Sequence, residues 1–281
     1  MAKVAMNEWF GESYTAVLAY YAALAPAAGF QGRCAMSIPA DIEGKRVLDV
    51  CCRKGKGAFA LADAVGPSGF VVGVDPDPDN IAAACAAAPG NHWAGAFWER
   101  CLRFSQAIPE NLFSDRIGDR AFDLVYINSV MNLVWSLPAS LAEFARVLAP
   151  GGRLWVAQGV FADDGLDALG EHAVMQDGAG MPGAGAALAK GTDAPSVDAS
   201  LMNTDRRDSV MSGHMPLDGE PGRIDVFSQA LSRAAFEQMC LEAGFSSVAF
   251  SSVSSIFGED PRHGKCPGGV RFCLADACAT I

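Results

Sequence analysis

The sequence predicts an α/β fold: a doubly wound, mostly parallel sheet that carries an insertion in its C-terminal part. Three observations predict it. Short strand-like runs alternate with segments of helical spacing along the chain. The strand-like runs are apolar almost throughout, which is typical of parallel strands that are buried on both faces. A stretch rich in Gly, Ala and Pro interrupts this order after residue 160.

The expected strands are short runs of aliphatic and β-branched residues. They are expected at Arg46–Val50, Phe70–Val74, Phe122–Ile127 and Leu154–Ala157, and near 247–253 and 269–275. The first four alternate with helices, so they are expected to run parallel. The last two follow one another without a helix between them. We therefore expect an antiparallel pair to complete the sheet.

The expected helices place their apolar residues on one stripe. They are expected at Gly57–Val65, Asp79–Ala88, Pro138–Leu148 and Leu231–Ala243. The third has a proline in its first turn and stops at Pro150-Gly151-Gly152, where proline and glycine cannot continue a helix. The last is terminated by Gly244.

Composition excludes several classes of partner. The formal net charge is −11 and the pI is about 4.7, so the surface repels phosphate backbones and anionic lipids. Neither nucleic acid nor a membrane is expected as a partner. No apolar run reaches the roughly 20 residues of a membrane span, and the N-terminal residues do not form a signal-peptide core. A cytoplasmic protein is expected.

The nine cysteines do not indicate a disulfide framework, because their number is odd and the chain is long. No Cys-x-x-Cys motif occurs and only four histidines are present, so no metal site is predicted.

Candidate functional residues lie at the carboxyl ends of expected strands, where open α/β sheets bind ligands. The first group is the loop from Asp49 to Gly57. The second is Asp75, which either accepts the hydroxyls of a nucleoside ribose or caps the next helix. The third is Asn128, which either orients a ligand or is an ordinary turn residue.

Four motifs in order resemble those of class I methyltransferases that use S-adenosylmethionine (SAM). They are LDV at 48–50, VGVD at 72–75, FDLV at 122–125 and RVLAPGGRL at 146–154. The chain is more narrowly similar to the arsenite methyltransferase family through 38–50, 65–75 and 128–133. The similarity spans about 34–160 and resumes more weakly at 231–256. It implies a Rossmann-like sheet of seven strands and SAM as the cofactor.

The resemblance also implies roles in cofactor binding for seven positions besides Cys51. Asp49 and Asn128 would meet the methionine end, and Asp75 the ribose. Pro76 would lie against the adenine, and Glu99 falls near the acidic position that follows the third strand. Gly55 would allow close approach of the backbone, and Arg53 lies in the same loop.

The loop after the first strand departs from the family pattern Gly-x-Gly-x-Gly. Cys51 and Arg53 occupy the first two glycine places, and only Gly55 matches. Glycine adopts a positive φ without a steric penalty, whereas cysteine and arginine incur one because they carry a Cβ. Arg53, Lys54 and Lys56 also add cations that would repel a sulfonium unless they point to solvent.

The thiols depart from the family as well. Cys34 falls where the family has one metalloid-binding thiol, but Ser129 replaces a second. Cys51 and Cys52 could substitute, although adjacent residues on a strand point to opposite sides. Basic neighbours would lower the pKa of a thiol here.

The sequence therefore predicts a SAM-dependent methyltransferase that acts on a small acceptor, with a thiophilic acceptor as one option. The catalytic candidates are Cys34, Cys51, Cys52 and Asn128. The alternative is a degenerate methyltransferase that serves as a partner subunit or as a thiol-based sensor. A nucleotide-linked oxidoreductase is less favoured because Gly-x-Gly-x-x-Gly is missing after the first strand. The sequence is compatible with either a homo-oligomer or a hetero-oligomer.

Four regions are expected. Residues 1–40 form a helical lead-in, and 41–160 form the SAM-binding core. Residues 161–222 form the Gly/Ala-rich insertion, which could serve as a lid, and 223–281 complete the sheet.

Overall fold

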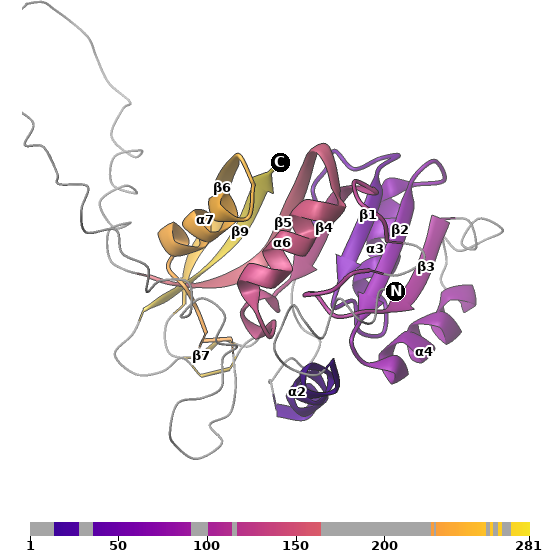
Figure 1. The fold of residues 1–281 in the computed structure, drawn as a ribbon, viewed down its shortest axis with the longest axis horizontal. Coiled ribbons are helices and arrows are strands. Elements are labelled where there is room, and N and C mark those ends of the chain that lie inside the picture. The colour runs from indigo at the N-terminus through magenta and orange to yellow at the C-terminus, as the bar shows by residue number, and fades with distance from the viewer. Residues whose placement is uncertain are drawn as a thin grey trace, which may run out of the picture. The chain divides into compact units, whose positions relative to one another are not determined.

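The computed structural model describes residues 14–27, 36–90, 101–113, 117–163, 226–227, 229–256, 259–260, 264–265 and 271–281. Seven strands form one sheet in the order β3-β2-β1-β4-β5-β9-β6 (Figure 1). The first five in this order run parallel to one another, and β9 runs antiparallel to both β5 and β6. The predicted doubly wound, mostly parallel sheet is confirmed.

The strands of this sheet are β1 (Arg46–Val50), β2 (Phe70–Asp75), β3 (Leu102–Gln106), β4 (Phe122–Asn128), β5 (Leu148–Ala162), β6 (Ser247–Ile256) and β9 (Phe272–Thr280). Two short strands, β7 (Glu259–Asp260) and β8 (Gly264–Lys265), pair with each other. The helices are α2 (Tyr14–Ala27), α3 (Lys56–Val65), α4 (Pro78–Ala87), α6 (Leu137–Val147) and α7 (Arg233–Glu242), with single 3₁₀ turns η1 (Ala88–Gly90) and η2 (Met131–Leu133).

The structure differs most from the sequence predictions at β3, β5 and β9. We did not predict β3, because its sequence LRFSQ alternates apolar and polar residues as an edge strand does. The final strand begins at Phe272, three residues later than expected, and continues to Thr280. β5 is longer than predicted, because it contains the turn Pro150-Gly151-Gly152, in which Gly151 has a φ of 76°.

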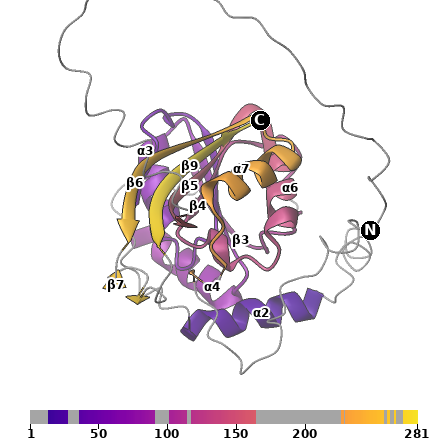
Figure 2. The same cartoon turned by 90° about the vertical axis from the view of Figure 1, so that its left-hand side faces the viewer.

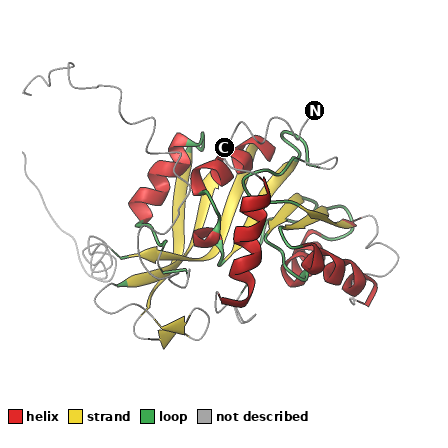
Figure 3. Cartoon of the chain, turned by 60° about the horizontal axis from the view of Figure 1, so that its bottom comes forward, coloured by secondary structure: helices red, strands yellow, loops and turns green. Residues whose placement is uncertain are grey.

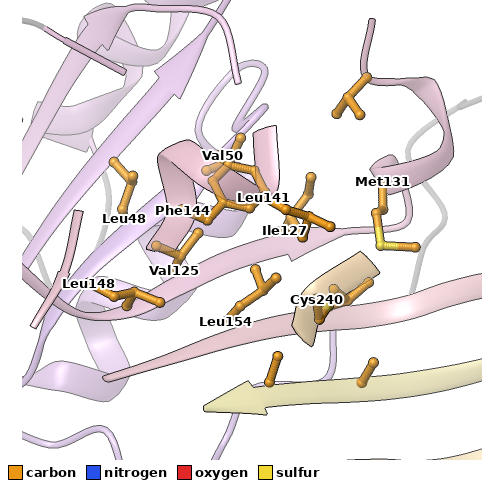
Figure 4. Close-up of a cluster of buried hydrophobic side chains, with 14 of the residues drawn as sticks. Leu48, Val50, Val125, Ile127, Met131, Leu141, Phe144, Leu148, Leu154 and Cys240 are labelled. Carbon is orange, nitrogen blue, oxygen red and sulfur yellow. The ribbon is translucent and has the colours of Figure 1, made fainter. Parts of the chain in front are cut away.

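Apolar side chains cover both faces of the sheet. On one face, Leu141 and Phe144 of α6 and Cys240 of α7 pack with strand residues such as Leu48 and Val125 (Figure 4). On the other face, α3 packs on residues of β1, β2 and β4. Figure 2 shows α3 on one side of the sheet and α6 and α7 on the other. The central strands are therefore buried on both faces, which explains their continuous apolar sequences.

Helix α2 packs on a third apolar cluster, beyond the carboxyl ends of the parallel strands. Its Leu24 is buried with Leu133 of η2 and with Val160 of β5, and Tyr20 and Tyr21 pack against the same cluster. Figure 1 draws α2 below the sheet, and Figure 3 brings this side of the molecule forward. The lead-in thus contributes side chains at the edge where ligands bind in such folds.

The expected insertion, 161–222, lies outside the described residues apart from its first three, so its role as a lid stays a prediction. Among the described residues, no helix has both the length and the apolar character needed to cross a bilayer. The cytoplasmic location also stays a prediction.

Asn132 joins the two chain segments that flank this insertion. Its side-chain amide donates to the carbonyl oxygens of Val160 and Val226, both at 2.8 Å. We expect Asn132→Ala to lower the free energy of unfolding by about 2 kcal/mol, because two buried carbonyl groups lose their donor. Denaturant unfolding measures this. An unchanged transition midpoint would show that the bridge contributes nothing to stability.

Candidate functional site

A pocket lies where β1, β2 and β4 end, with a cavity volume of ≈ 100 Å³. It is at the point where the strand order turns from β1 towards β4, the place expected for a ligand. Four segments line it: Tyr21 and Leu24 of α2; Cys51 and Arg53 after β1; Asp75, Pro76, Asp77 and Asn80 after β2; and Val130 and Leu133 after β4. The sequence analysis placed Cys51, Arg53, Asp75 and Pro76 here, but not the residues of α2.

Asp75 is the buried carboxylate of this pocket, with only 4% of its surface exposed. Its Oδ2 accepts the backbone N–H of Arg53 at 2.8 Å. Its Oδ1 accepts the N–H of Asp77 at 3.1 Å and the amide of Asn80 at 3.0 Å. A carboxylate has about four lone-pair sites, so these three donors leave one site for a ligand hydroxyl.

The loop after β1 has a left-handed backbone at three alternate positions. The φ angles are 58° at Cys51, 50° at Arg53 and 85° at Gly55. The loop therefore keeps the conformation that glycine favours although two of its residues carry side chains, at a cost of roughly 1–2 kcal/mol each. These side chains extend into the pocket wall.

Gly55 has a packing role that the sequence analysis did not anticipate. A Cβ added to it would lie 2.9 Å from the ring of Phe104 and 3.0 Å from that of Phe59. Its missing side chain thus makes room for two aromatic rings of the core. Access of a ligand to the backbone is not the only reason for glycine at this position.

Asp49 lies below the same loop, at the end of β1, and is 3% exposed. Its Oδ2 is buried and has no hydrogen-bond partner among the described residues. Gly57 lies against this oxygen, because a Cβ there would come within 2.8 Å of it. Burial and the nearby Asp75 raise the pKa of Asp49 well above its usual value.

Tyr21 and Glu110 form a hydrogen-bonded pair behind the pocket wall. The hydroxyl of Tyr21 donates to Glu110, at 2.7 Å from Oε1 and 3.0 Å from Oε2. It also accepts the backbone N–H of Trp135 at 3.1 Å, and Glu110 accepts that of Ser136 at 3.0 Å. Glu110 is 1% exposed, and burial raises its pKa. The sequence analysis missed both residues.

The charges of the site separate by depth. Arg53, Lys54 and Lys56 are exposed, whereas the described carboxyls that are buried near the pocket are Asp49, Asp75 and Glu110. Solvent screens exposed charges, so the predicted repulsion between the loop cations and a sulfonium is weak. None of the described residues buried at the site is a cation.

A family model described as a methyltransferase domain matches residues 41–189, more than half of the chain. The chain belongs to this family. The arsenite methyltransferase of Aquipseudomonas alcaligenes is 34% identical over 143 residues, which are 50% of this chain and 40% of that protein. The demethylmenaquinone methyltransferase of Geobacillus sp. (strain WCH70) is 33% identical over 112 residues, which are 40% of this chain and 44% of that protein.

Among solved structures, this methyltransferase domain is similar to CrArsM, an arsenic(III) S-adenosylmethionine methyltransferase from Chlamydomonas reinhardtii. The TM-score is 0.57 at 24% identity, and the match covers 92% of this chain and 72% of that chain. The class I methyltransferase fold is thereby confirmed. The chain spans less than half the length of the two curated relatives above, so their activities do not transfer to it directly.

Two thiols of the methyltransferase domain behave differently from the prediction. Burial, followed by the nearby carboxylates, raises the pKa of both Cys51 and Cys52 well above the usual value. The expected lowering by Arg53 and Lys54 is wrong, because those cations are exposed and the carboxylates are buried. Cys51 lines the pocket, whereas Cys52 is buried beside Gly73, whose added Cβ would lie 3.0 Å from its Sγ. Cys34 lies outside the described residues.

The remaining predicted residues divide as follows. Pro76 lies on the pocket wall. Asn128 ends β4 half-buried and accepts the hydroxyl of Ser129 at 3.0 Å, and the pocket lining continues with Val130 instead. Glu99 was expected to follow the third strand, which is wrong, because β3 begins only at Leu102. Glu99 itself lies outside the described residues, and Glu110 is an acidic residue that does follow β3.

The stability of the methyltransferase domain is expected to fall as the pH rises from the ordinary pKa of a carboxyl group towards the raised pKa values of its buried carboxyls. The pKa values of Asp49, Asp75 and Glu110 are raised in the folded state. A raised carboxyl pKa means that the folded protein binds the proton more tightly, so its contribution to stability is present at low pH and is lost as the pH rises through the folded pKa. Denaturant unfolding at several pH values measures the slope. Glu110→Gln is expected to make it shallower, and an equal slope in both proteins would contradict the assignment.

Proposed function

We propose that the chain is a SAM-dependent methyltransferase and that its donor binds in the pocket beside Asp75. The observation that carries this proposal is the buried Asp75 carboxylate at the end of β2, next to a left-handed loop and to a pocket at the turn of strand order. A nucleoside ribose finds its hydroxyl acceptor at this position in dinucleotide folds. The fold of the family and the motif order point to the same ligand.

The residues present fit SAM in charge and in hydrogen bonding. Asp75 has one acceptor site left for a ribose hydroxyl, and Asp49 has a buried oxygen without a partner among the described residues, which could accept from a donor group. Pro76 supplies an apolar wall for the base. When bound, SAM supplies an electrophilic methyl group on a sulfonium. The chain itself would hold the nucleoside, exclude water and align the acceptor, which can provide much of the rate enhancement.

For the acceptor we propose a small molecule. Its class stays open, because the relatives named above include an arsenite and a demethylmenaquinone methyltransferase. A thiophilic acceptor held jointly by Cys51 and Cys52 is disfavoured, because only Cys51 of the two faces the pocket and both thiols are protonated at neutral pH. Asn128, at the end of β4, is our candidate for orienting the acceptor.

One observation favours a second candidate, a degenerate homologue that acts as a partner subunit. Cys51 and Arg53, which stand where the family has glycine, line the pocket. If their side chains do not move, they occupy space that the nucleoside would need. The version of this alternative in which the thiols act as a sensor is disfavoured, because a raised thiol pKa lowers reactivity.

Calorimetry with SAM and S-adenosylhomocysteine on the full chain tests the proposal. Saturable binding of both, followed by transfer of labelled methyl to a small acceptor, is the expected result. Binding without transfer to arsenite, quinones or small thiols would favour the partner subunit. No binding at millimolar ligand would refute the donor site.

A further inference from the structure

The proposed donor pocket is backed by buried carboxylates from three separate parts of the chain. Asp49, Asp75 and Glu110 are each at most 4% exposed. Asp49 and Asp75 interact electrostatically with each other, and all three interact with Cys51 in the pocket wall. The cations of the loop after β1 are exposed. Three buried acidic groups therefore surround this pocket, and no cation among the described residues is buried with them.

Of these three carboxyls, Glu110 is the one to which the proposed donor site gives no role. Among its donors are the Tyr21 hydroxyl and the Ser136 N–H, and both are neutral. The other described ionisable groups that face it are Tyr20 from α2 and Cys51 from the loop, and neither carries a positive charge. Tyr21 lines the cavity and Glu110 does not, so the hydrogen bond between them links Glu110 to the cavity wall. When ionised, Glu110 thus carries a negative charge that no described cation neutralises, one side chain away from the pocket.

We propose that Glu110, acting through Tyr21, makes the pocket select a positively charged donor over its neutral product. The inference rests on the proposed function, since it concerns the same site. SAM and S-adenosylhomocysteine share their nucleoside and amino-acid ends and differ by a methyl group and a unit of positive charge. Contacts of Asp75, Asp49 and Pro76 with the shared parts cannot distinguish the two. A buried charge near the sulfur can, because attraction is weakly screened in the interior.

Glu110 would in this way act on turnover as a positioning residue without touching the ligand. A site that prefers the sulfonium releases the thioether more readily once the methyl group has left. The arrangement also couples donor binding to protonation, because a bound cation favours the ionised form of a nearby carboxyl. At a pH at which Glu110 is partly protonated, binding of SAM should release a proton from it. Binding of S-adenosylhomocysteine should not.

The test is calorimetry with SAM and with S-adenosylhomocysteine on the wild type and on Glu110→Gln. The glutamine side chain preserves the shape of the original and can still accept from Ser136. We expect the wild type to bind SAM more tightly, and the ratio of the two dissociation constants to shrink about tenfold in the variant, mostly through weaker SAM binding. The matched control is Glu143→Gln, which removes another buried carboxylate, one that is paired with Arg146 and lies outside the pocket.

A second pair of variants keeps the inference testable if Glu110→Gln does not fold. The Tyr21 hydrogen bond lowers the pKa of Glu110. The preference for SAM should be lost on acidification, when Glu110 becomes protonated. Tyr21→Phe should therefore shift this loss to a higher pH. Tyr20→Phe should not, because the Tyr20 hydroxyl donates to the carbonyl oxygen of Leu133. An unchanged ratio in Glu110→Gln, or the same pH profile in both tyrosine variants, would overturn the role of Glu110 and leave the donor site intact. Failure of the wild type to bind either ligand would overturn both proposals.

Discussion

Replacing Asp75 by alanine is expected to weaken SAM binding at least about a hundredfold and to lower the free energy of unfolding by about 3 kcal/mol. The carboxylate collects three donors, from Arg53, Asp77 and Asn80, and orders the loop after β1 against the start of α4. Alanine leaves two partly buried backbone N–H groups without this acceptor and removes the ribose acceptor. Calorimetry and denaturant unfolding measure the two effects.

Asp79→Asn is the matched control, because Asp79 is an exposed carboxylate four residues away in the first turn of α4. It should change neither binding nor stability by more than a small amount. Asp75→Asn keeps the size of the side chain and separates shape from charge. If Asp75→Ala were unstable yet bound SAM with unchanged affinity, Asp75 would be a structural residue and the nucleoside would lie elsewhere.

Restoring both glycines in the loop after β1 is expected to tighten SAM binding about tenfold or more. Cys51→Gly with Arg53→Gly removes two side chains from the pocket wall and relieves two left-handed residues. Relief of about 1–2 kcal/mol at each position is offset by the roughly 0.5–1 kcal/mol of extra backbone entropy that glycine loses on folding. We therefore expect the stability to stay within about 2 kcal/mol of the wild type or to increase, while the affinity rises.

Gly55→Ala, in the same loop, should have the opposite effect. Its φ is 85°, and the new Cβ would collide with the rings of Phe104 and Phe59. A marked loss of stability is expected from thermal unfolding. If the double glycine variant bound SAM no better than the wild type, the side chains of Cys51 and Arg53 would not limit the pocket.

The central part of the fold was predictable from the sequence because burial on both faces leaves a local signature. β1, β2 and β4 are nearly continuous apolar runs, and α6 ends at Val147, shortly before Pro150-Gly151-Gly152. β3 was not predictable in this way. It is an edge strand whose polar residues Arg103 and Ser105 break the apolar run, so its sequence does not show that it pairs with β2.

The candidate site was predictable only where it follows a strand. Asp75 and the loop from Cys51 to Gly55 could be placed because the carboxyl ends of parallel strands meet at one edge. The Tyr21–Glu110 pair joins residues 89 positions apart, and no motif marks either one. The direction of the thiol pKa shifts was wrong for the same reason. Neighbours in the sequence suggested cations, but the thiols are buried, and they share this buried space with Asp49 and with the more distant Asp75 and Glu110.

A crystal structure of the full chain grown with S-adenosylhomocysteine tests the account most directly. We predict density for the nucleoside in the pocket, with a ribose hydroxyl within hydrogen-bond distance of the Asp75 carboxylate and the side chain of Arg53 turned towards solvent. Ordered ligand at any other place, or a pocket filled by Cys51 and Arg53 at saturating ligand, would contradict it.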